Sequence, residues 1–149
     1  MEIDGWQLFA HPLLIEQLER LIAMVERSRA KDPRSYRDGA NAKLLAALRR
    51  LLFETIPEDP TRSEYQQGDT LGPENRHWFR AKFGGQRFRL FFRYDSRAKV
   101  IINAWVNDSD TLRTYGHKND AYAVFRKMLA RGNPPNDWEA LLKASKSAG

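Results

Sequence analysis

Positively charged side chains recur at short, mostly alternating intervals near the middle of the chain. Between residues 80 and 93 they are Arg80, Lys82, Arg87, Arg89 and Arg93. Successive residues of a β-strand point to opposite faces, so cations two residues apart share a face of their strand. The guanidinium group of arginine is planar, always charged and able to bind two phosphate oxygens at once. The pattern therefore favours a surface that binds a polyanion such as RNA.

The positive charge of the chain is concentrated in the same region. Residues 76–118 hold ten Lys or Arg and three acids, whereas the whole chain has a net charge of +6. The rest of the chain is therefore close to neutral, and a concentrated positive field of this kind attracts polyanions. The alternative is a solvated strand face whose charges prevent edge-to-edge aggregation, but one or two lysines would serve that purpose. Four arginines within residues 80–93 fit phosphate binding better.

Three short strands are expected to carry these side chains. They span residues 77–83, 86–94 and 99–106, and the short turns between them predict an antiparallel meander. Gly84 and Gly85 suit a tight hairpin turn, because glycine accepts the positive φ that two-residue turns require. The other face of these strands is rich in phenylalanine. We expect that face to pack on a core, and the face of the cations and their interleaved aromatics to bind RNA.

Helices are predicted before the strands. A short strand at residues 5–10 precedes an amphipathic helix at residues 12–30. Asp32 and Pro33 match the cap and first position of a second helix, which Pro57 is expected to end. Two helices joined by a short break should form a hairpin that covers one face of the sheet.

The remaining segments complete the expected fold. Residues 57–76 are rich in proline and glycine and are expected to form a loop or a weakly ordered segment. After the strands, a polar loop at residues 107–116 leads to a helix at residues 119–131 and a short last helix that contains Trp138. The order predicts one α+β domain over residues 1–149. It would have an antiparallel sheet, an N-terminal helical hairpin and C-terminal helices.

Composition excludes several classes of site. The chain has no cysteine, which rules out disulfides, cysteine-based zinc sites and thiol nucleophiles. Its three histidines show no paired metal-ligand spacing, so no metal or other cofactor is expected. No apolar run approaches the length of a membrane span, and no basic segment followed by an apolar run marks the N-terminus. We therefore expect a cytoplasmic protein without a membrane partner.

Several longer segments carry a resemblance to a known family. They are residues 5–12, 78–84, 87–94, 107–116, 120–132 and 134–139. In sequence and order, they resemble the YhaV toxin family of the RelE/ParE superfamily. The segments cover nearly the whole chain, and their length makes a chance match improbable. The resemblance implies a RelE-like fold for the single domain.

The resemblance also implies a function and partners. Members of this kind are toxins of type II toxin-antitoxin systems that cleave messenger RNA, commonly on the ribosome, and so inhibit translation and growth. The implied antitoxin is of the PrlF (SohA) type with an AbrB-like DNA-binding domain. Operator DNA would then be bound only through the toxin-antitoxin complex.

A metal-independent endoribonuclease would use the 2′-OH of its substrate as the nucleophile. It must align that hydroxyl with the adjacent phosphate, stabilise the added negative charge and move two protons. Arg80, Arg89 and Arg113 are the candidates for charge stabilisation. Lys82 lies on the same strand face as Arg80 and is a candidate for proton transfer. Tyr115 stands where the superfamily often has a functional tyrosine, but a packing role before the next helix is an equal alternative.

Other residues are assigned less direct roles. The candidates for contacts with the RNA backbone are Arg87, Arg93, Lys99 and Lys118. His77 is expected to point away from Arg80, and neither it nor His117 matches a family position, so the general base stays unassigned. Trp78 and Trp105 either stack on bases or, more commonly for tryptophan, are buried.

Two other functions remain open. One is a non-catalytic RNA-binding module that uses the same basic sheet. The other is a ParE-like toxin that acts on its target by protein contact. The clustering of Arg80, Lys82 and Arg89 on one face favours the ribonuclease over the ParE-like toxin, whereas only an activity assay separates it from the binding module.

Overall fold

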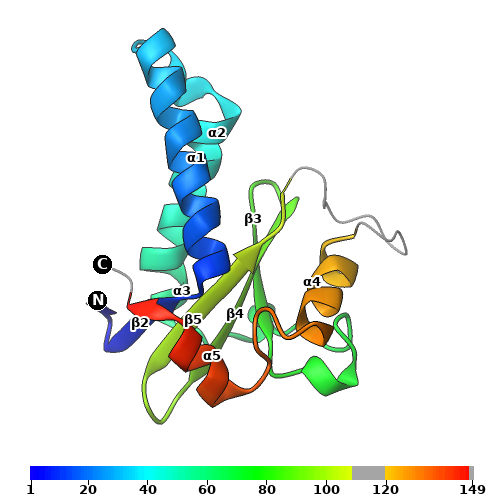
Figure 1. The fold of residues 1–149 in the computed structure, drawn as a ribbon. Helices are drawn as coiled ribbons and strands as arrows, with labels where there is room; N and C mark the ends of the chain where they lie inside the picture. The colour runs from blue at the N-terminus through cyan, green and yellow to red at the C-terminus, as the bar shows by residue number, and fades with distance from the viewer. Residues whose placement is uncertain (109–119, 148–149) are drawn as a thin grey trace.

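The computed structural model describes residues 1–108 and 120–147 (Figure 1). The helices and strands are β1 (Glu2–Ile3), β2 (Trp6–Ala10), α1 (Pro12–Lys31), α2 (Ala40–Arg50), α3 (Ile56–Glu58), β3 (Phe79–Phe83), β4 (Phe88–Asp95), β5 (Val100–Val106), α4 (Ala121–Ala130), α5 (Trp138–Ala144) and β6 (Lys146–Ser147). The predicted order of a strand, two helices, three strands and two helices is present, with β1, α3 and β6 in addition to it. The fold is a mixed α/β arrangement around one sheet.

The sheet has the order β1-β2-β5-β4-β3, and β6 adds to β2. Strands β3, β4 and β5 form the predicted antiparallel meander. The expectation of an antiparallel sheet throughout is wrong at β2, which runs parallel to β5. The reason is topological: the chain leaves β2 through the helical pair and the β3–β4 hairpin before it returns as β5. This makes β5 a central strand, and all its residues are buried.

The β3–β4 turn is longer than predicted. Phe83 pairs with Phe88, so four residues connect the strands, and Gly84, Gly85 and Gln86 all have positive φ. A four-residue connection is also common in hairpins, although it needs more residues with unusual backbone angles. Arg87 therefore lies in the turn and not on the face of β4 that carries Arg89.

Both faces of the sheet are covered, which corrects the expectation of an open cation face. Leu90 and Phe92 of β4 pack on one side with the leucines of α1 and α2. Phe91 packs on the other side with Trp78 and with Phe125 of α4. The alternation that places arginines on this face also places these aromatic rings there, and rings of that size must be buried. Neither Trp78 nor Phe91 has exposed surface, so neither is available to stack on a base.

Helices α1 and α2 form a helical arm that projects beyond the sheet (Figure 1). The predicted first helix is confirmed, but the second begins at Ala40 instead of following Pro33. Asp32 ends α1, and its carboxylate accepts the backbone N–H of Ser35 at 3.1 Å, so it stabilises a turn between the helices. The chain continues beyond α2 through a wide π-helical turn into α3, which contains Pro57.

Residues 57–76 form a loop with short helical turns, which is one of the two forms expected for this segment. Gln67 and Asn75 are buried, and their side chains replace the missing secondary-structure hydrogen bonds. The Gln67 amide donates to the carbonyl of Asn75 at 2.9 Å and accepts the N–H of Leu71 at 3.1 Å. A bridge from Gln66 to Phe79 then joins this segment to β3. These contacts provide a fixed support beside the edge strand.

Candidate active site

Two of the predicted catalytic arginines converge on one tyrosine hydroxyl. The Nε of Arg80, on β3, donates to the hydroxyl oxygen of Tyr122 at 2.9 Å. The Nε of Arg89, on the neighbouring β4, donates to the same oxygen at 3.2 Å. Guanidinium groups only donate hydrogen bonds, so the phenol oxygen is the acceptor in both contacts. We call Arg80, Arg89 and Tyr122 the arginine–tyrosine cluster.

The start of α4 positions the tyrosine of this cluster. Tyr122 lies in the first turn of the helix, and its own N–H donates to the carboxylate of the N-cap residue Asp120 at 3.1 Å. Only 4% of Tyr122 is exposed. The cap, the helix and the sheet therefore fix the hydroxyl oxygen between two strands.

The two arginines of the cluster differ in exposure. Arg89 is 5% exposed, and its guanidinium also donates to the carbonyl of Gln86 at 2.8 Å and lies 5.7 Å from the centre of the Tyr122 ring. Arg80 is half-buried, and its guanidinium also donates to the carbonyl of Glu64 at 2.5 Å. Arg80 therefore presents the more accessible guanidinium. A ligand would reach Arg89 through the small part that remains exposed.

Within the described part of the chain, no carboxylate forms an ion pair with either arginine of the cluster. Their charges are stabilised by carbonyl and phenol oxygens, which do not neutralise them. A pair of fixed, un-neutralised cations favours an anionic ligand such as a phosphate.

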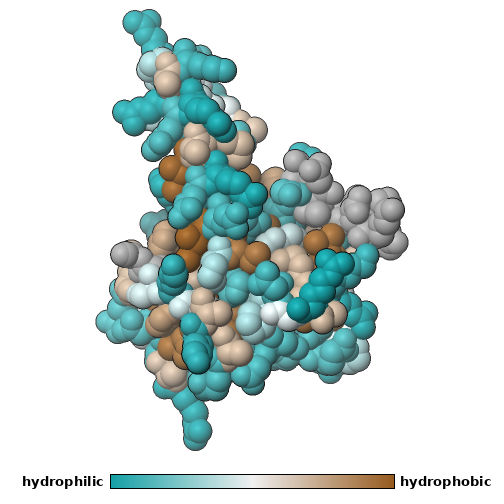
Figure 2. Space-filling model, in the orientation of Figure 1, coloured by the Kyte–Doolittle hydropathy of each residue, from teal (hydrophilic) through white to brown (hydrophobic). Residues whose placement is uncertain are grey.

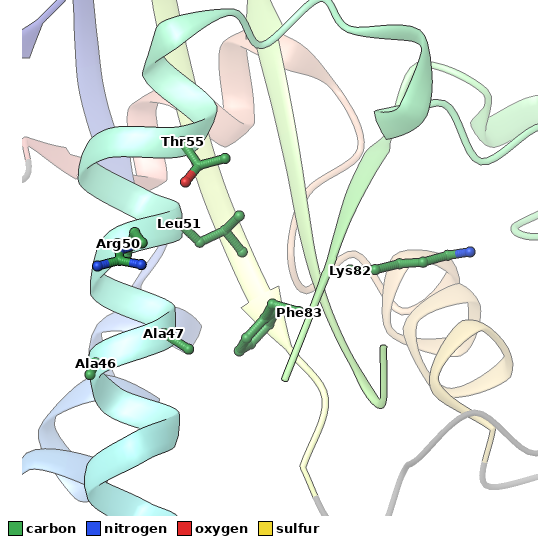
Figure 3. A pocket seen from close by; sticks show the side chains of 7 residues that line it. All are labelled: Ala46, Ala47, Arg50, Leu51, Thr55, Lys82 and Phe83. Atoms are coloured by element: carbon green, nitrogen blue, oxygen red, sulfur yellow. The ribbon is translucent and has the colours of Figure 1, made fainter. Parts of the chain in front are cut away.

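Lys82 adds a third cation to the same face. It lies opposite Arg89 in the β3–β4 register and is exposed. A pocket of about 500 Å³ lies between β3 and α2, and both Lys82 and Phe83 are among its lining residues. Figure 3 shows that the Phe83 ring points to the α2 side, whereas the Lys82 ammonium points away from it. The alternation predicted from the sequence therefore holds in β3.

The end of β5 meets the β3–β4 turn beside the cluster. The buried Asn107 side chain accepts the N–H of Arg89 at 2.6 Å and donates to the carbonyl of Arg87 at 3.3 Å. Arg87 itself is exposed and lines a cleft of about 520 Å³ between the helical arm and this end of the sheet. The cleft is also lined by Phe88, Asn107 and Asp108, so it lies on the face of the sheet that packs on α1 and α2, opposite the face that carries the arginine–tyrosine cluster.

Three of the predicted site residues lie outside the described residues: Arg113, Tyr115 and Lys118. The segment that contains them starts after Asp108, at the end of β5, and ends before Asp120, at the cap of α4. Both ends therefore lie at the cluster.

Arg93 and Lys99 are not brought to the cluster. Arg93 is four residues beyond Arg89 on the same strand, which is about 13 Å at the usual rise per residue. Its guanidinium carbon lies 5.6 Å from the ring centre of Trp78 and 5.2 Å from that of Trp138, and it donates to the carbonyl of Asn136 at 2.6 Å. Burial lowers the pKa of Arg93. Its surroundings are those of a residue that joins α5 to the sheet.

Lys99 occupies the β4–β5 turn, at the end of the sheet opposite the cluster. It has a positive φ, and its ammonium lies 4.8 Å from the ring centre of Trp6. Parity along a strand predicts a face but not a position along it, which is why the sequence grouped Lys99 with the other cations.

The described histidines take part in packing. The Nε2 of His77 lies 2.6 Å from the side-chain oxygen of Asn136, which also accepts the indole N–H of Trp78 at 2.8 Å. The N-cap of α5 is Asp137. His11 accepts the N–H of Leu13 at 3.2 Å and so caps α1. In residues 1–108 and 120–147, no group of three or more acidic or histidine side chains is placed to hold a metal ion.

Tyr122 was not identified from the sequence as a site residue. Its position on the apolar side of a predicted helix suggested a core residue. That side does face the sheet, but it faces the strands' arginines as well as their aromatic rings. The available signal in the sequence was a tyrosine two residues after a helix cap. It indicates a site residue only when α4 is known to cover the face of the sheet that carries the arginines.

The described helices include none that is long and apolar enough to cross a bilayer.

Comparison with known proteins gives a family match over most of the chain. The model of the family Toxin_YhaV, described as a toxin with endonuclease activity of a toxin-antitoxin system, matches residues 8–146. No solved structure matches the chain.

Two relatives from Escherichia coli are similar over nearly their whole length. Toxin YhaV of strain CFT073 is 47% identical over 147 residues, which cover 98% of this chain and 96% of the relative. Ribonuclease toxin YhaV of strain K12 is 49% identical over 142 residues, which cover 95% and 92%.

Proposed function

We propose that this chain, which belongs to the YhaV family of toxins with endonuclease activity, cleaves RNA at the arginine–tyrosine cluster by attack of the substrate's own 2′-OH. The observation that carries the proposal is the fixing of Arg80 and Arg89 by one tyrosine oxygen. The relative from strain K12 is named a ribonuclease toxin, which supports RNA as the substrate. No metal ion takes part in the proposed reaction.

The reaction needs negative charge to be stabilised at the scissile phosphate. The 2′-oxygen bonds to phosphorus, its proton passes to a base, and the bond to the 5′-oxygen breaks as that oxygen takes up a proton. The products are a 2′,3′-cyclic phosphate and a 5′-OH. Arg80 and Arg89 bind the non-bridging oxygens as charge increases on them, and Arg113 adds a third guanidinium.

Tyr122 has a positioning role in this scheme. Its oxygen takes the Nε donors of both arginines, which orients their terminal NH₂ groups as one unit. Proton transfer is assigned to Lys82 and Tyr115, the first of which is exposed beside the cluster. These roles are proposals that rest on residue type and position.

RNA outside the scissile bond would contact the remaining cations. Arg87 is the best placed of them, because it is exposed in the β3–β4 turn, two residues before Arg89. Backbone contacts by Lys99 and Lys118 are retained as proposals, with Lys99 serving RNA that reaches the opposite end of the sheet, whereas the contacts of Arg93 favour a packing role.

The biological setting proposed is that of the family. The substrate is messenger RNA, bound on the ribosome in the cytoplasm, and cleavage inhibits translation and growth. The partner is a PrlF-type antitoxin with an AbrB-like domain, and operator DNA is bound only through that antitoxin. We also propose that the sheet and its flanking helices correspond to a RelE-like arrangement. Family membership weighs against a non-catalytic RNA-binding module and a ParE-like toxin.

One experiment tests the chemistry directly. The purified protein is incubated with a short RNA that contains one cleavage site and with the same RNA carrying a single 2′-deoxy nucleotide 5′ to that bond. We expect cleavage of the first only, with a 2′,3′-cyclic phosphate end, and the same rate in a chelator. Cleavage of the deoxy-substituted RNA at the same bond, or loss of cleavage in the chelator, would overturn the proposed mechanism.

A further inference from the structure

The helical arm carries a second cluster of positive charge that the candidate active site does not use. At the arm tip (residues 27–43) the acids are Asp32 and Asp38, whereas the cations are Arg27, Arg29, Lys31, Arg34, Arg37 and Lys43. All six cations are exposed. Figure 2 shows the projecting end of the arm as a predominantly hydrophilic surface.

These cations lack the ion pairs found elsewhere on the molecule. Some exposed arginines at other positions pair with nearby carboxylates, as Arg76 does with Asp69 and Arg126 with Glu74. Among the described residues, no carboxylate pairs with a cation of the arm tip. Asp32 is instead occupied as an acceptor for the N–H of Ser35. The charge of the tip is therefore not neutralised locally.

Helix stabilisation explains only part of this charge. Arg29 and Lys31 are in the last turn of α1, where cations interact favourably with the helix dipole. Arg34 and Arg37 lie between the helices, and Lys43 lies in the first turn of α2, where a cation is unfavourable. The helix dipole therefore does not account for these three positions.

An aromatic ring stands among the guanidinium groups of the tip. The guanidinium carbons of Arg29 and Arg37 lie 5.9 Å and 5.7 Å from the ring centre of Tyr36, which is partly exposed. Arginine and tyrosine planes grouped in this way are typical of surfaces that bind phosphate and base together. An acidic protein segment would be attracted by the charge but would gain less from the ring, which is why we favour RNA.

The arm tip also lies on a path from the active site. The cleft of about 520 Å³ is lined by Arg20 and Asn41 of the arm on one side and by Arg87 and Asn107 of the sheet on the other. From Leu21, the last buried residue of α1, the helix runs roughly 15 Å further to Lys31. An RNA strand that leaves the cluster around the β3–β4 turn, where Arg87 is exposed, would enter this cleft on the other face of the sheet and meet the tip.

We propose that the arm tip is a second binding site for RNA phosphates, which holds RNA extending beyond the cleavage site. This proposal rests on the proposed function, in that it takes RNA as the substrate. It predicts that the arm favours long RNA over oligonucleotides that fill only the active site, because only long RNA reaches both sites.

The test compares two triple variants that each remove three exposed cations. One carries Arg29→Gln, Arg34→Gln and Arg37→Gln at the tip, and its matched control carries Arg131→Gln, Lys143→Gln and Lys146→Gln near the C-terminus. Binding of a long RNA made non-cleavable by 2′-deoxy substitution is measured over a range of salt concentrations. The ratio of kcat/KM for a long RNA to that for a short oligonucleotide is measured separately.

We expect the tip variant to bind the long RNA about tenfold more weakly at physiological salt, and its salt slope to fall by about 2, since each phosphate contact on a single strand contributes about 0.7. The ratio of kcat/KM for the long RNA to kcat/KM for the short oligonucleotide falls by a similar factor. The control variant behaves as the wild type in both measurements. Equal effects of both triple variants would overturn the proposal. It would also be overturned if the tip variant bound long RNA as tightly as the wild type does and bound only the antitoxin more weakly. The RNA used for binding cannot be cleaved, so this measurement does not depend on activity. If the wild-type protein cleaved no RNA, the proposed function would be contradicted, and the binding result would still test the role of the arm tip.

Discussion

Arg89 and Arg93 stand on the same face of the same strand, yet their surroundings differ. Arg89 shares a tyrosine oxygen with Arg80, and its other contacts are to a turn and a ring. Arg93 lies near the rings of Trp78 and Trp138 and donates to the carbonyl of Asn136. The difference arises from what covers each end of the face: the start of α4 at Arg89 and the segment leading into α5 at Arg93.

This comparison shows that one strand face can serve two purposes. At the α4 end the arginines are held as a pair by one tyrosine oxygen, which suits a phosphate. At the α5 end a single arginine joins two segments that are distant in the sequence. Substitutions at the first end should therefore change activity, whereas substitutions at the second end should change stability.

The largest effect is expected at the accessible arginine of the cluster. Arg80→Ala removes a guanidinium proposed to stabilise the transition state, so the cleavage rate should fall by about 100-fold or more. Single-turnover cleavage of a defined RNA measures it, with thermal unfolding to confirm that the variant is folded. A folded Arg80→Ala variant with the wild-type rate would show that the active end of the face has been misplaced.

A smaller effect is expected from Tyr122→Phe, which keeps the ring and removes only the shared acceptor. The two Nε donors lose their partner, so the arginines are less well oriented and kcat should fall roughly 10- to 100-fold. Stability should fall by about 1 kcal/mol. A steady-state measurement is expected to show the loss in kcat with little change in KM. A change in stability alone would make Tyr122 a packing residue.

The opposite result is expected at the other end of the face. Arg93→Ala removes two cation–ring contacts and a charged hydrogen bond, so the free energy of unfolding should fall by about 2 kcal/mol. Urea denaturation measures this, and cleavage is compared at a temperature where both proteins are folded. If the variant instead kept its stability and bound RNA more weakly, Arg93 would be an RNA contact and the two ends would be functionally alike.

The smallest effect concerns the pH dependence of stability at the α5 end. Burial is the main reason that the pKa of His77 is lowered in the folded protein, so the unfolded chain binds the proton more readily. The contribution of His77 is therefore complete above its ordinary pKa of about 6.5 and is lost as the pH falls toward the lowered folded value. His77→Gln should weaken the decline in stability between about pH 7 and pH 5.

A second variant for the same measurement is His11→Asn. The pKa of His11 is also lowered by burial, and asparagine preserves an N-cap for α1. Each variant should flatten part of the curve. An unchanged curve in His77→Gln would show that this histidine does not titrate differently in the folded and unfolded states.

Much of the fold and part of the site could be predicted from the sequence. Alternation along β3 placed Arg80 and Lys82 opposite Phe83, because strand periodicity is a local property. The helix that starts at Pro12 was likewise evident from its proline and its apolar spacing. These predictions depend on residues close together in the chain.

The rest depended on contacts between distant segments. Nothing near Tyr122 in the sequence indicates that its hydroxyl meets arginines from two strands. Arg93 resembles Arg89 in type and parity, and they differ in that Tyr122 packs on Arg89 whereas Trp78 and Trp138 pack on Arg93. The parallel pairing of β2 with β5 also depends on the path of the whole chain. Local patterns indicate the face of a strand, whereas tertiary packing decides what covers it.

The central claim is that the arginines and Tyr122 act as one unit, and a double-mutant cycle tests it most directly. Single-turnover cleavage is measured for Arg80→Ala, Tyr122→Phe and the double variant. Residues that act together have non-additive effects, so the double variant should be little slower than Arg80→Ala alone. If the two rate losses multiply, or if Tyr122→Phe cleaves at the wild-type rate, the shared hydroxyl does not couple to catalysis and the account is contradicted.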